Sequence, residues 1–516
     1  AALALLVSTA VNIVNSPVLA AASPRAVPLW QTISVPGRLH PGTMLLLTDG
    51  AVMVQDQGPS NSGAPGWWLL TPNSMDSYVD GSWRQIASLP TGYGPISFAS
   101  AVLPDGRDII EGGEDNLGHT GALTNLGAVY QPLTNHWTSV EPPVGATWGT
   151  IGDAPSVVLA NGTFMLGGSG NYTNKSQALL DPSTLTWTKT GTGQVDNNEE
   201  EGFTLLPIDK VLAVGLRRGV TPDPGYAEVY DPTSGTWSEA GTFPVPVVTS
   251  GGDEIGPQVL LPNGTVLVVG DTGQNAVFDV ATGGWSGAPS FPVINGQQIH
   301  VADGPAAVLP DGDVLIDASP GLYHTPSYFF VFNGSTVTRV QGPPYAASLE
   351  SNWGYMLVLP TGQVLFNDRV GQMEVYNGGG APNASWMPVI SRVPRDLAPA
   401  VPTRSPAGSS TASPKVPPTA RLPERDRLPA RPPYVFQNPA CRLCPDLRHV
   451  VDGGHAWPAF PHPLPGAEGS AGRSGNGRRG RERDRLDPLA GHGQMTVGSS
   501  ASRAPSRARG RTFRSG

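Results

Sequence analysis

The chain carries one unit of about fifty residues that recurs seven times between residues 43 and 390, a period typical of propellers, solenoids and arrays. Each unit starts with a short apolar run and a tight turn, as in Leu103-Pro-Asp-Gly106. Asp-Gly and Asn-Gly pairs accept positive φ at low cost, so we expect two-residue β-hairpins here. The last residues of the seven turns are spaced by 48 to 56 positions: Gly50, Gly106, Gly162, Lys210, Gly264, Gly312 and Gly362.

The second half of each unit predicts two further strands. In four units an aromatic residue or leucine precedes Trp by seven positions, as Tyr130 precedes Trp137. We interpret the two residues as members of a third strand and a Trp-bearing fourth strand. Trp30 is a second candidate for the outer strand of the last unit, where it competes with Trp386. The other units vary the spacing: Tyr78 to Trp83, Phe332 to Val337 and Tyr376 to Trp386.

Seven units of four short antiparallel strands predict an all-β fold, a seven-bladed β-propeller. A radial ring leaves few exposed strand edges, and the Leu, Val, Tyr and Trp side chains of neighbouring blades bury one another. The composition agrees, because 65 Gly, 54 Pro and only 14% charged residues argue against a helical bundle or a coiled coil. A long array of β-sandwiches is the alternative, and the single periodicity disfavours it.

Three features of the repeat together resemble the kelch repeat. They are the turn, the pairs Gly112-Gly113 and Gly167-Gly168 after second strands, and the motif Tyr230-Asp-Pro-Thr-Ser-Gly-Thr-Trp237. The resemblance covers residues 43–390 and extends to the propeller domain of galactose-oxidase-like secreted proteins. It implies a kelch-type propeller whose ligand face is built from the loops after the second strands and the loops that lead into the first strands. It does not define an activity, because such folds host many functions.

Acidic residues recur in the loops that lead into the first strands. Asp153, Glu201 and Asp303 lie nine residues before the last turn residue of their unit, Glu254 lies ten before it and Glu350 twelve before it. If the first strand lines the centre of the ring, these carboxylates converge. Converging carboxylates require a cation, a shared proton or a basic ligand, and oxygen-rich sites suit Ca²⁺. Asp153, Glu201 and Asp303 are therefore candidate Ca²⁺ ligands, and solvated strand-end residues are the alternative.

The loops also supply the remaining candidate ligand-binding residues. Arg217, Tyr323 and His324 follow second strands, and Trp353 precedes a first strand. Aromatic, carboxylate and amide groups at one end of a ring of blades are compatible with sugar binding. Packing of the loops against one another is the alternative for each residue taken singly.

An enzymatic function is the alternative to a binding function. The propeller segment contains no Cys, so the Cys–Tyr copper cofactor implied by the galactose-oxidase resemblance cannot form there. An oxidase or hydrolase would need metal-bound His119, His300 or His324, or paired carboxylates such as Glu201 and Asp303. None of these histidines has metal-ligand spacing. We therefore favour a function without catalytic residues and without a resident cofactor other than Ca²⁺.

Both ends of the chain differ from the repeats. Residues 1–22 combine an apolar stretch with small residues at Ala20-Ala21-Ala22, which predicts an N-terminally incomplete signal peptide and hence a secreted protein. No other run of roughly 18 apolar residues occurs, so we expect no integral membrane span in the mature chain. Residues 391–516 are rich in Pro, Arg, Gly and Ser and predict a disordered tail. Our hypothesis for its origin is a frame-shifted remnant of a β-sandwich domain.

The charge of the chain is divided between its two parts. The net charge of −9 combines −21 for residues 1–390 with +12 for residues 391–516. The acidic part does not suit nucleic acid, because phosphate contacts require Lys and Arg. Cys441 and Cys444 lie near two histidines in the basic part, but the spacing does not match a zinc finger and chance explains it better.

These patterns divide the chain into a signal peptide at residues 1–22, a propeller at residues 23–390 and a tail at residues 391–516. We predict a secreted, monomeric binding module whose partner is a glycan or an extracellular surface protein. The alternative is an extracellular oxidase or hydrolase that uses the same end of the ring.

Overall fold

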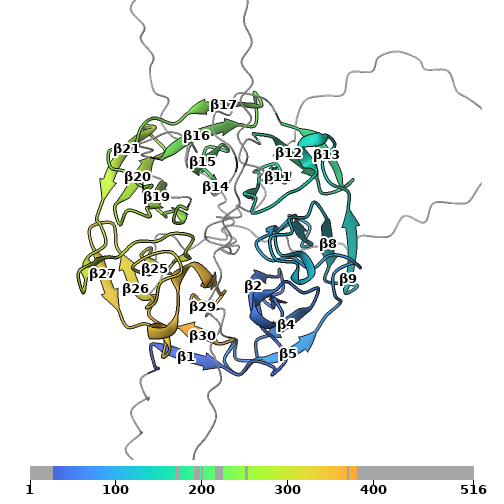
Figure 1. Ribbon diagram of the computed structural model, residues 1–516, viewed down its shortest axis with the longest axis horizontal. Helices are drawn as coiled ribbons and strands as arrows, with labels where there is room; N and C mark the ends of the chain where they lie inside the picture. Colours follow the sequence, from blue (N-terminus) through green and yellow to red (C-terminus); the bar gives the residue numbers. More distant parts are fainter. Residues whose placement is uncertain are drawn as a thin grey trace, which may run out of the picture. The chain divides into compact units, whose positions relative to one another are not determined.

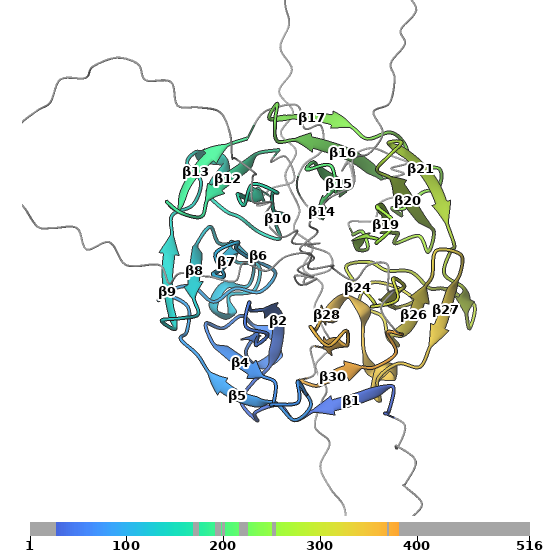
Figure 2. The same ribbon diagram turned by 180° about the vertical axis from the view of Figure 1, so that it is seen from behind.

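Seven four-stranded antiparallel sheets form a ring of blades in the computed structural model, as the repeat predicts (Figure 1). Figure 2 shows the same ring from behind, and the first strands that are labelled there lie nearest the centre. The structure describes residues 27–168, 175–190, 198, 202–215, 225–249, 254–368 and 371–380. The prediction of an all-β, seven-bladed propeller is therefore confirmed.

The strands of each blade follow one another in the chain, except in the seventh. The first three blades are β2 (Pro41–Leu46), β3 (Val52–Asp56), β4 (Trp67–Thr71) and β5 (Ser82–Gln85); β6 (Ala99–Val102), β7 (Asp108–Glu111), β8 (Gly127–Gln131) and β9 (His136–Val140); and β10 (Ser156–Val158), β11 (Phe164–Gly167), β12 (Gln177–Asp181) and β13 (Thr186–Lys189). The next three are β14 (Gly202–Leu205), β15 (Val211–Gly215), β16 (Tyr226–Asp231) and β17 (Thr236–Glu239); β18 (Gln258–Leu260), β19 (Thr265–Val269), β20 (Asn275–Asp279) and β21 (Gly284–Ala288); and β24 (Ala306–Val308), β25 (Val314–Ala318), β26 (Tyr328–Phe332) and β27 (Val337–Val340). The seventh contains β28 (Tyr355–Val358), β29 (Val364–Asn367), β30 (Met373–Tyr376) and β1 (Trp30–Ile33). The connecting loops hold the hairpin β22 (Val293–Ile294) and β23 (Gln297–Gln298) and the short 3₁₀ helices η1 (Pro59–Asn61), η2 (Asn116–Gly118), η3 (Ala146–Trp148), η4 (Ala346–Ser348) and η5 (Ser351–Trp353).

The turns between first and second strands are three-residue loops, one residue longer than predicted. In the second blade Leu103 accepts a hydrogen bond from Gly106 N–H and donates one to the Arg107 carbonyl. Only Gly106 has positive φ (81°), as in a type I turn that is followed by a left-handed residue. In the fourth blade the left-handed position belongs to Asp209, at φ 59°, and not to Lys210. Asp209 therefore adopts a backbone conformation that glycine adopts in the other six turns.

The predicted aromatic pairs lie directly opposite each other on the third and fourth strands. Tyr130 pairs with Trp137, and their ring centroids are 5.0 Å apart. The same register joins Tyr230 to Trp237 and Phe278 to Trp285. Such pairs of large side chains stabilise the outer half of each sheet. In the first blade the partner of Trp83 is Leu70, so the predicted pair Tyr78–Trp83 is wrong: Tyr78 lies in the loop after β4.

The same tryptophans also join adjacent blades. The indole Nε1 of Trp137 donates to the Ala87 carbonyl at 2.9 Å, directly after the fourth strand of the preceding blade. Trp83, Trp187, Trp285 and Trp30 make the equivalent bond to the carbonyls of Ser34, Glu141, Ala240 and Gln341. Trp237 differs, because its indole donates to the Gln177 side chain. The repeated Trp thus contributes both a cross-strand contact and a hydrogen bond between blades.

The ring is closed by a strand from the beginning of the described chain. β1 pairs antiparallel with β30, and Trp30 lies opposite Tyr376 with ring centroids 4.9 Å apart. Trp30 therefore takes the position that tryptophan holds in the other blades, and the expectation that it supplies the outer strand is confirmed. Trp386, the competing candidate, lies outside the described residues.

The hydrophobic core lies between the blades. One cluster packs Val157 and Met165 of the third blade against Phe203 and Trp237 of the fourth, and equivalent clusters follow around the ring. The first strands contact their neighbours in the order β2, β6, β10, β14, β18, β24 and β28, and β28 contacts β2. Each blade is consequently buried on both faces by its neighbours, as repeat architectures require.

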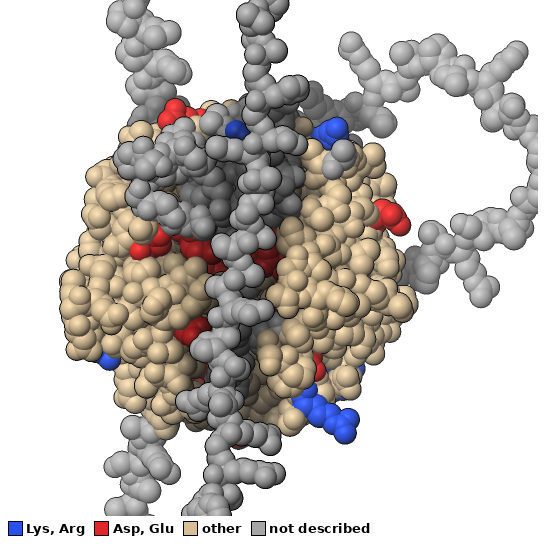
Figure 3. Space-filling view, viewed as in Figure 1, with Lys and Arg blue, Asp and Glu red and all other residues tan. Residues whose placement is uncertain are grey.

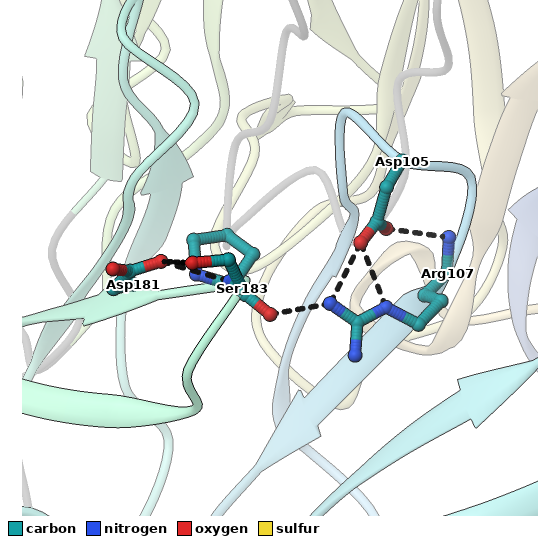
Figure 4. A network of polar contacts seen from close by, with 5 residues as sticks. Asp105, Arg107, Asp181 and Ser183 are labelled. Atoms are coloured by element: carbon teal, nitrogen blue, oxygen red, sulfur yellow. Dashed lines mark hydrogen bonds and ion pairs between the residues drawn. The ribbon is translucent and has the colours of Figure 1, made fainter. Parts of the chain in front are cut away.

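Polar contacts join two blades on the face that carries the turns (Figure 4). Arg107 binds the Asp105 carboxylate, with Nε at 2.8 Å, and its guanidinium also donates to the carbonyl of Pro182 in the third blade. The neighbouring Asp181 carboxylate accepts from the N–H and the hydroxyl of Ser183. These contacts lie at the end of the blades opposite the predicted ligand face.

The predicted signal peptide, residues 1–22, and the predicted tail, residues 391–516, lie outside the described residues. The helices in the described part of the chain are short 3₁₀ turns, and none has the length and apolar character needed to cross a membrane.

Candidate functional site

The loops that lead into first strands and the loops after second strands lie at the same end of each blade, because neighbouring strands run antiparallel. The predicted site residues that the structure describes belong to these two sets of loops. These seven residues are Asp153, Glu254, Asp303, Glu350, Tyr323, His324 and Trp353. Glu201 and Arg217 lie outside the described residues.

Four of the predicted residues lie in two loops of the sixth and seventh blades. Tyr323 and His324 lie in the loop between β25 and β26, and Glu350 and Trp353 lie in the segment around η5 that leads into β28. The rings of Tyr323 and Trp353 are 5.9 Å apart at their centroids and tilted by 39°. We call Tyr323, His324, Glu350 and Trp353 the aromatic group.

The aromatic group is held in place by hydrogen bonds. The Trp353 indole donates to Glu350 Oε2 at 2.9 Å, and Tyr323 N–H donates to Asn352 Oδ1 at 3.2 Å. Tyr323 has φ +57°, a left-handed conformation that a bulky residue seldom adopts, and 59% of the residue is exposed. The Tyr323 backbone is therefore held by Asn352, and its exposed ring lies beside Trp353. Residues in such conformations are frequent at binding sites.

Below the aromatic group the two loops are joined by buried hydroxyl groups. The hydroxyls of Ser319 and Ser351 lie 2.7 Å apart, and Ser319 also donates to the Gly321 carbonyl. His300 pairs through its backbone with Ser319, and burial lowers the pKa of its imidazole. Nδ1 of His324 is 2.6 Å from the Leu322 carbonyl, so Nδ1 carries a proton if this contact is a hydrogen bond.

Asp153, Glu254 and Asp303 each lie three or four residues before the start of a first strand. Asp303 has φ +56°, and its N–H donates to the Ile255 carbonyl, next to Glu254. Asp153 precedes β10. Figure 3 shows acidic side chains both near the centre of the ring and at its rim on the face in view, whereas Lys and Arg lie toward the rim.

This acidic distribution does not form a recognisable metal site in the part of the chain that the structure describes. No group of three or more His, Cys, Asp or Glu side chains there is arranged to hold a metal ion. The Ca²⁺ ligation expected for Asp153, Glu201 and Asp303 therefore stays a prediction. His119 lies exposed in the loop between β7 and β8, in a different blade from His300 and His324.

One further loop carboxyl has an altered acidity. Asp271 follows β19, and its Oδ1 accepts from the N–H of Thr249. Burial raises the pKa of Asp271 to about 6, although the hydrogen bond from Thr249 opposes the shift. This carboxyl consequently ionises close to neutral pH.

Sequence reasoning missed a set of buried polar residues near the ends of the second strands. Counted from the left-handed turn residue, the position five residues on holds Gln55, Glu111, Asp317 and Asn367 in four blades. We call these four residues the polar column; all are fully buried. The constant spacing after each turn was a usable signal, because a buried strand rarely carries carboxyl or amide groups without a reason.

Comparisons with known proteins extend only to the fold. No family model matches the chain, and no curated protein sequence matches it significantly. Among solved structures it is similar to a fungal alcohol oxidase of the AA5 family in complex with copper, with 15% identity over 69% of this chain and 79% of that chain and a TM-score of 0.49. It is also similar to YjhT, with 17% identity over 60% of this chain and 99% of that chain and a TM-score of 0.39. The chain's own blades establish its architecture, a seven-bladed β-propeller.

Proposed function

We propose that the chain is a secreted binding module that takes a glycan at the aromatic group of the sixth and seventh blades. The observation that carries the proposal is the Tyr323 ring, which stands exposed beside Trp353 in a left-handed backbone position. An exposed aromatic ring whose backbone is held before binding offers a flat apolar surface at a reduced entropic cost. Such surfaces suit the C–H face of a sugar ring.

The polar neighbours support a sugar more than an apolar ligand. The Glu350 carboxylate accepts one hydrogen bond from Trp353, and its other oxygen offers a further acceptor. The imidazole of His324 and the hydroxyl of Tyr323 belong to exposed residues. A few polar groups around an aromatic surface fix the orientation of a hydroxyl-rich ligand.

The test is binding of the full chain to an array of neutral and acidic oligosaccharides, followed by calorimetry with a free sugar that is retained. We expect Tyr323→Ala and Trp353→Ala each to weaken binding about tenfold, the loss of roughly 1.4 kcal/mol of stacking. Leu133→Ala is the matched control, because Leu133 is 93% exposed in the β8–β9 turn at the other end of the blades. Retention of no sugar, or equal affinity in Tyr323→Ala, would refute the glycan proposal.

The proposal includes export, which the apolar segment at residues 1–22 supports. Expression behind an initiator Met, followed by N-terminal sequencing of the product in the medium, tests it. Recovery of the whole product inside the cell, with residues 1–22 intact, would contradict export.

A further inference from the structure

The polar column contains two amides and two carboxylic acids at equivalent positions of the repeat. The amide of Gln55 donates to the Pro95 carbonyl of the next blade, and the amide of Asn367 donates to the Gly42 carbonyl of the next blade at 2.8 Å. In the first and seventh blades a donor at this position therefore joins adjacent blades. An ionised carboxylate has no proton to donate, whereas a neutral carboxylic acid has one.

Asp317 occupies this position in the sixth blade. Its side chain reaches the seventh blade, because a β-carbon added to Gly354 would lie 2.9 Å from Asp317 Oδ2. Asp317 is fully buried, and neither of its carboxyl oxygens has a hydrogen-bond partner in the described part of the chain. The Ser327 hydroxyl lies beside it without reaching hydrogen-bond geometry. A buried charge in such surroundings is costly, so the group is held uncharged.

The charges around Asp317 favour the same state. Burial raises the pKa of Asp317 well above its usual range, the Ser327 hydroxyl opposes the shift, and the negative charge of Asp368 adds to it. The other titratable groups of the adjoining loops are Asp303, which precedes β24, Glu350, whose carboxylate binds Trp353, the phenol of Tyr323, and the imidazoles of His300 and His324. None of them offers Asp317 an ion pair among the described residues.

Asp317 and Gly354 lie on the contact between the sixth and seventh blades, which we call the seam. The seam continues into the aromatic group. Two residues after Asp317, the Ser319 hydroxyl meets that of Ser351, and next to Ser351 the Asn352 side chain accepts from Tyr323 N–H. A separation of the strand end at Asp317 from Gly354 would therefore loosen both loops that carry the aromatic group.

We infer that Asp317 is a proton-dependent latch: while it is neutral it stays buried in the closed contact between the sixth and seventh blades, and its ionisation opens this contact and releases the loop that carries Tyr323. Opening the seam exposes the carboxyl to water and lets the proton leave to solvent. Weaker ligand binding at higher pH then follows, a consequence that rests on the proposed function. The opening itself does not depend on any ligand.

Hydrogen exchange of the full chain, followed by mass spectrometry between pH 5 and pH 8, tests the latch. The readout is the exchange rate of the wild type divided by that of Asp317→Asn, measured for peptides that cover residues 319–327 and 350–358. This ratio cancels the intrinsic pH dependence of exchange. We expect the ratio to rise by up to about tenfold per pH unit, the linkage expected of one ionising group. A ratio that stays constant, or one that falls with pH as it would for a carboxylate holding a cation, would overturn the inference.

Asn367→Asp provides a second variant, should Asp317→Asn fail to fold. It places a carboxyl at the equivalent position of the seam between the seventh and first blades, where Asn367 binds Gly42. We expect exchange in residues 41–46 to become pH-dependent, and unchanged exchange there would contradict the role assigned to the polar column. Neither experiment uses a sugar. A seam that opens with pH in a protein that binds no sugar would refute the proposed function and leave the latch intact.

Discussion

Replacing Trp30 with alanine tests how much of the propeller depends on its closing strand. Trp30 is only 9% exposed, and its ring contacts Phe329, Phe366 and Tyr376 at centroid distances of 5.1, 5.9 and 4.9 Å. Its indole also donates to the Gln341 carbonyl at 2.7 Å. The substitution therefore removes the aromatic contacts of β1 with the sixth and seventh blades and one hydrogen bond.

The magnitude follows from these contacts. Burial of a tryptophan side chain removes roughly 200 Å² from water, which is worth about 5 kcal/mol at 25 cal/mol per Å². Substitutions of buried aromatic residues by alanine cost about 3–5 kcal/mol, so we expect about 4 kcal/mol for Trp30→Ala. Trp30→Phe keeps most of the contacts and loses the hydrogen bond to Gln341, so we expect about 1–2 kcal/mol.

The assay combines unfolding in denaturant with limited proteolysis of the full chain. Trp285→Ala is the matched control, because Trp285 has the equivalent pair with Phe278 and the equivalent bond to Ala240 in a blade of consecutive strands. We expect Trp30→Ala, but not Trp285→Ala, to make residues 27–35 sensitive to protease in the native state. Full protection of residues 27–35 in Trp30→Ala, with a loss below about 1 kcal/mol, would refute the view that this side chain holds the ring closed.

Three further predictions concern other parts of the ring. The folded-state pKa of Asp271, about 6, lies above its ordinary value of 3.8, so its contribution to stability is present at low pH and is lost as the pH rises toward 6. The free energy of unfolding should fall between pH 4 and pH 7 by up to about 2 kcal/mol less in Asp271→Asn than in wild type. An equal fall in the two proteins would contradict the raised pKa of Asp271. Arg107→Ala breaks the contacts with Asp105 and with the third blade. We expect the free energy of unfolding to fall by about 1 kcal/mol, and by less in high salt. A fall that does not depend on salt would argue against an ionic origin. Gly113 has φ +103°, and an added β-carbon would lie 2.5 Å from the Ile96 carbonyl oxygen. Gly113→Ala should therefore lower the free energy of unfolding by more than about 1 kcal/mol. An unchanged melting temperature would contradict this prediction.

The repeat predicted the blades because its signals are local. A glycine-containing turn and an aromatic pair seven residues apart act within one hairpin, and both recur often enough to identify the unit. Tyr78 was misplaced because the loop after β4 is longer than in other blades, so that Leu70 and not Tyr78 faces Trp83. Asp209 was missed because a non-glycine residue holds the left-handed position there.

The candidate site was only partly predictable, because it depends on contacts between blades. Tyr323, Glu350 and Trp353 were selected for their chemistry, but nothing in the local sequence indicated that Tyr323 and Trp353 would meet. Asn352 was not selected, since its role is a single hydrogen bond to the backbone of a residue 29 positions away. Asp317 was also overlooked, because its significance appears only when it is aligned with the amides of the other blades.

The closing strand also sets an order of events during synthesis. Trp30 and Tyr376 are opposite each other in the folded ring but 346 residues apart in the chain. At about 5–20 residues per second, the ribosome adds the intervening segment in roughly 20–70 s. During that time the strand that is made first has no partner, and an unpaired apolar strand edge is a site for aggregation. Residues 30–33 therefore stay without their partner strand until the seventh blade has emerged, and slow translation of the last repeats lengthens that interval.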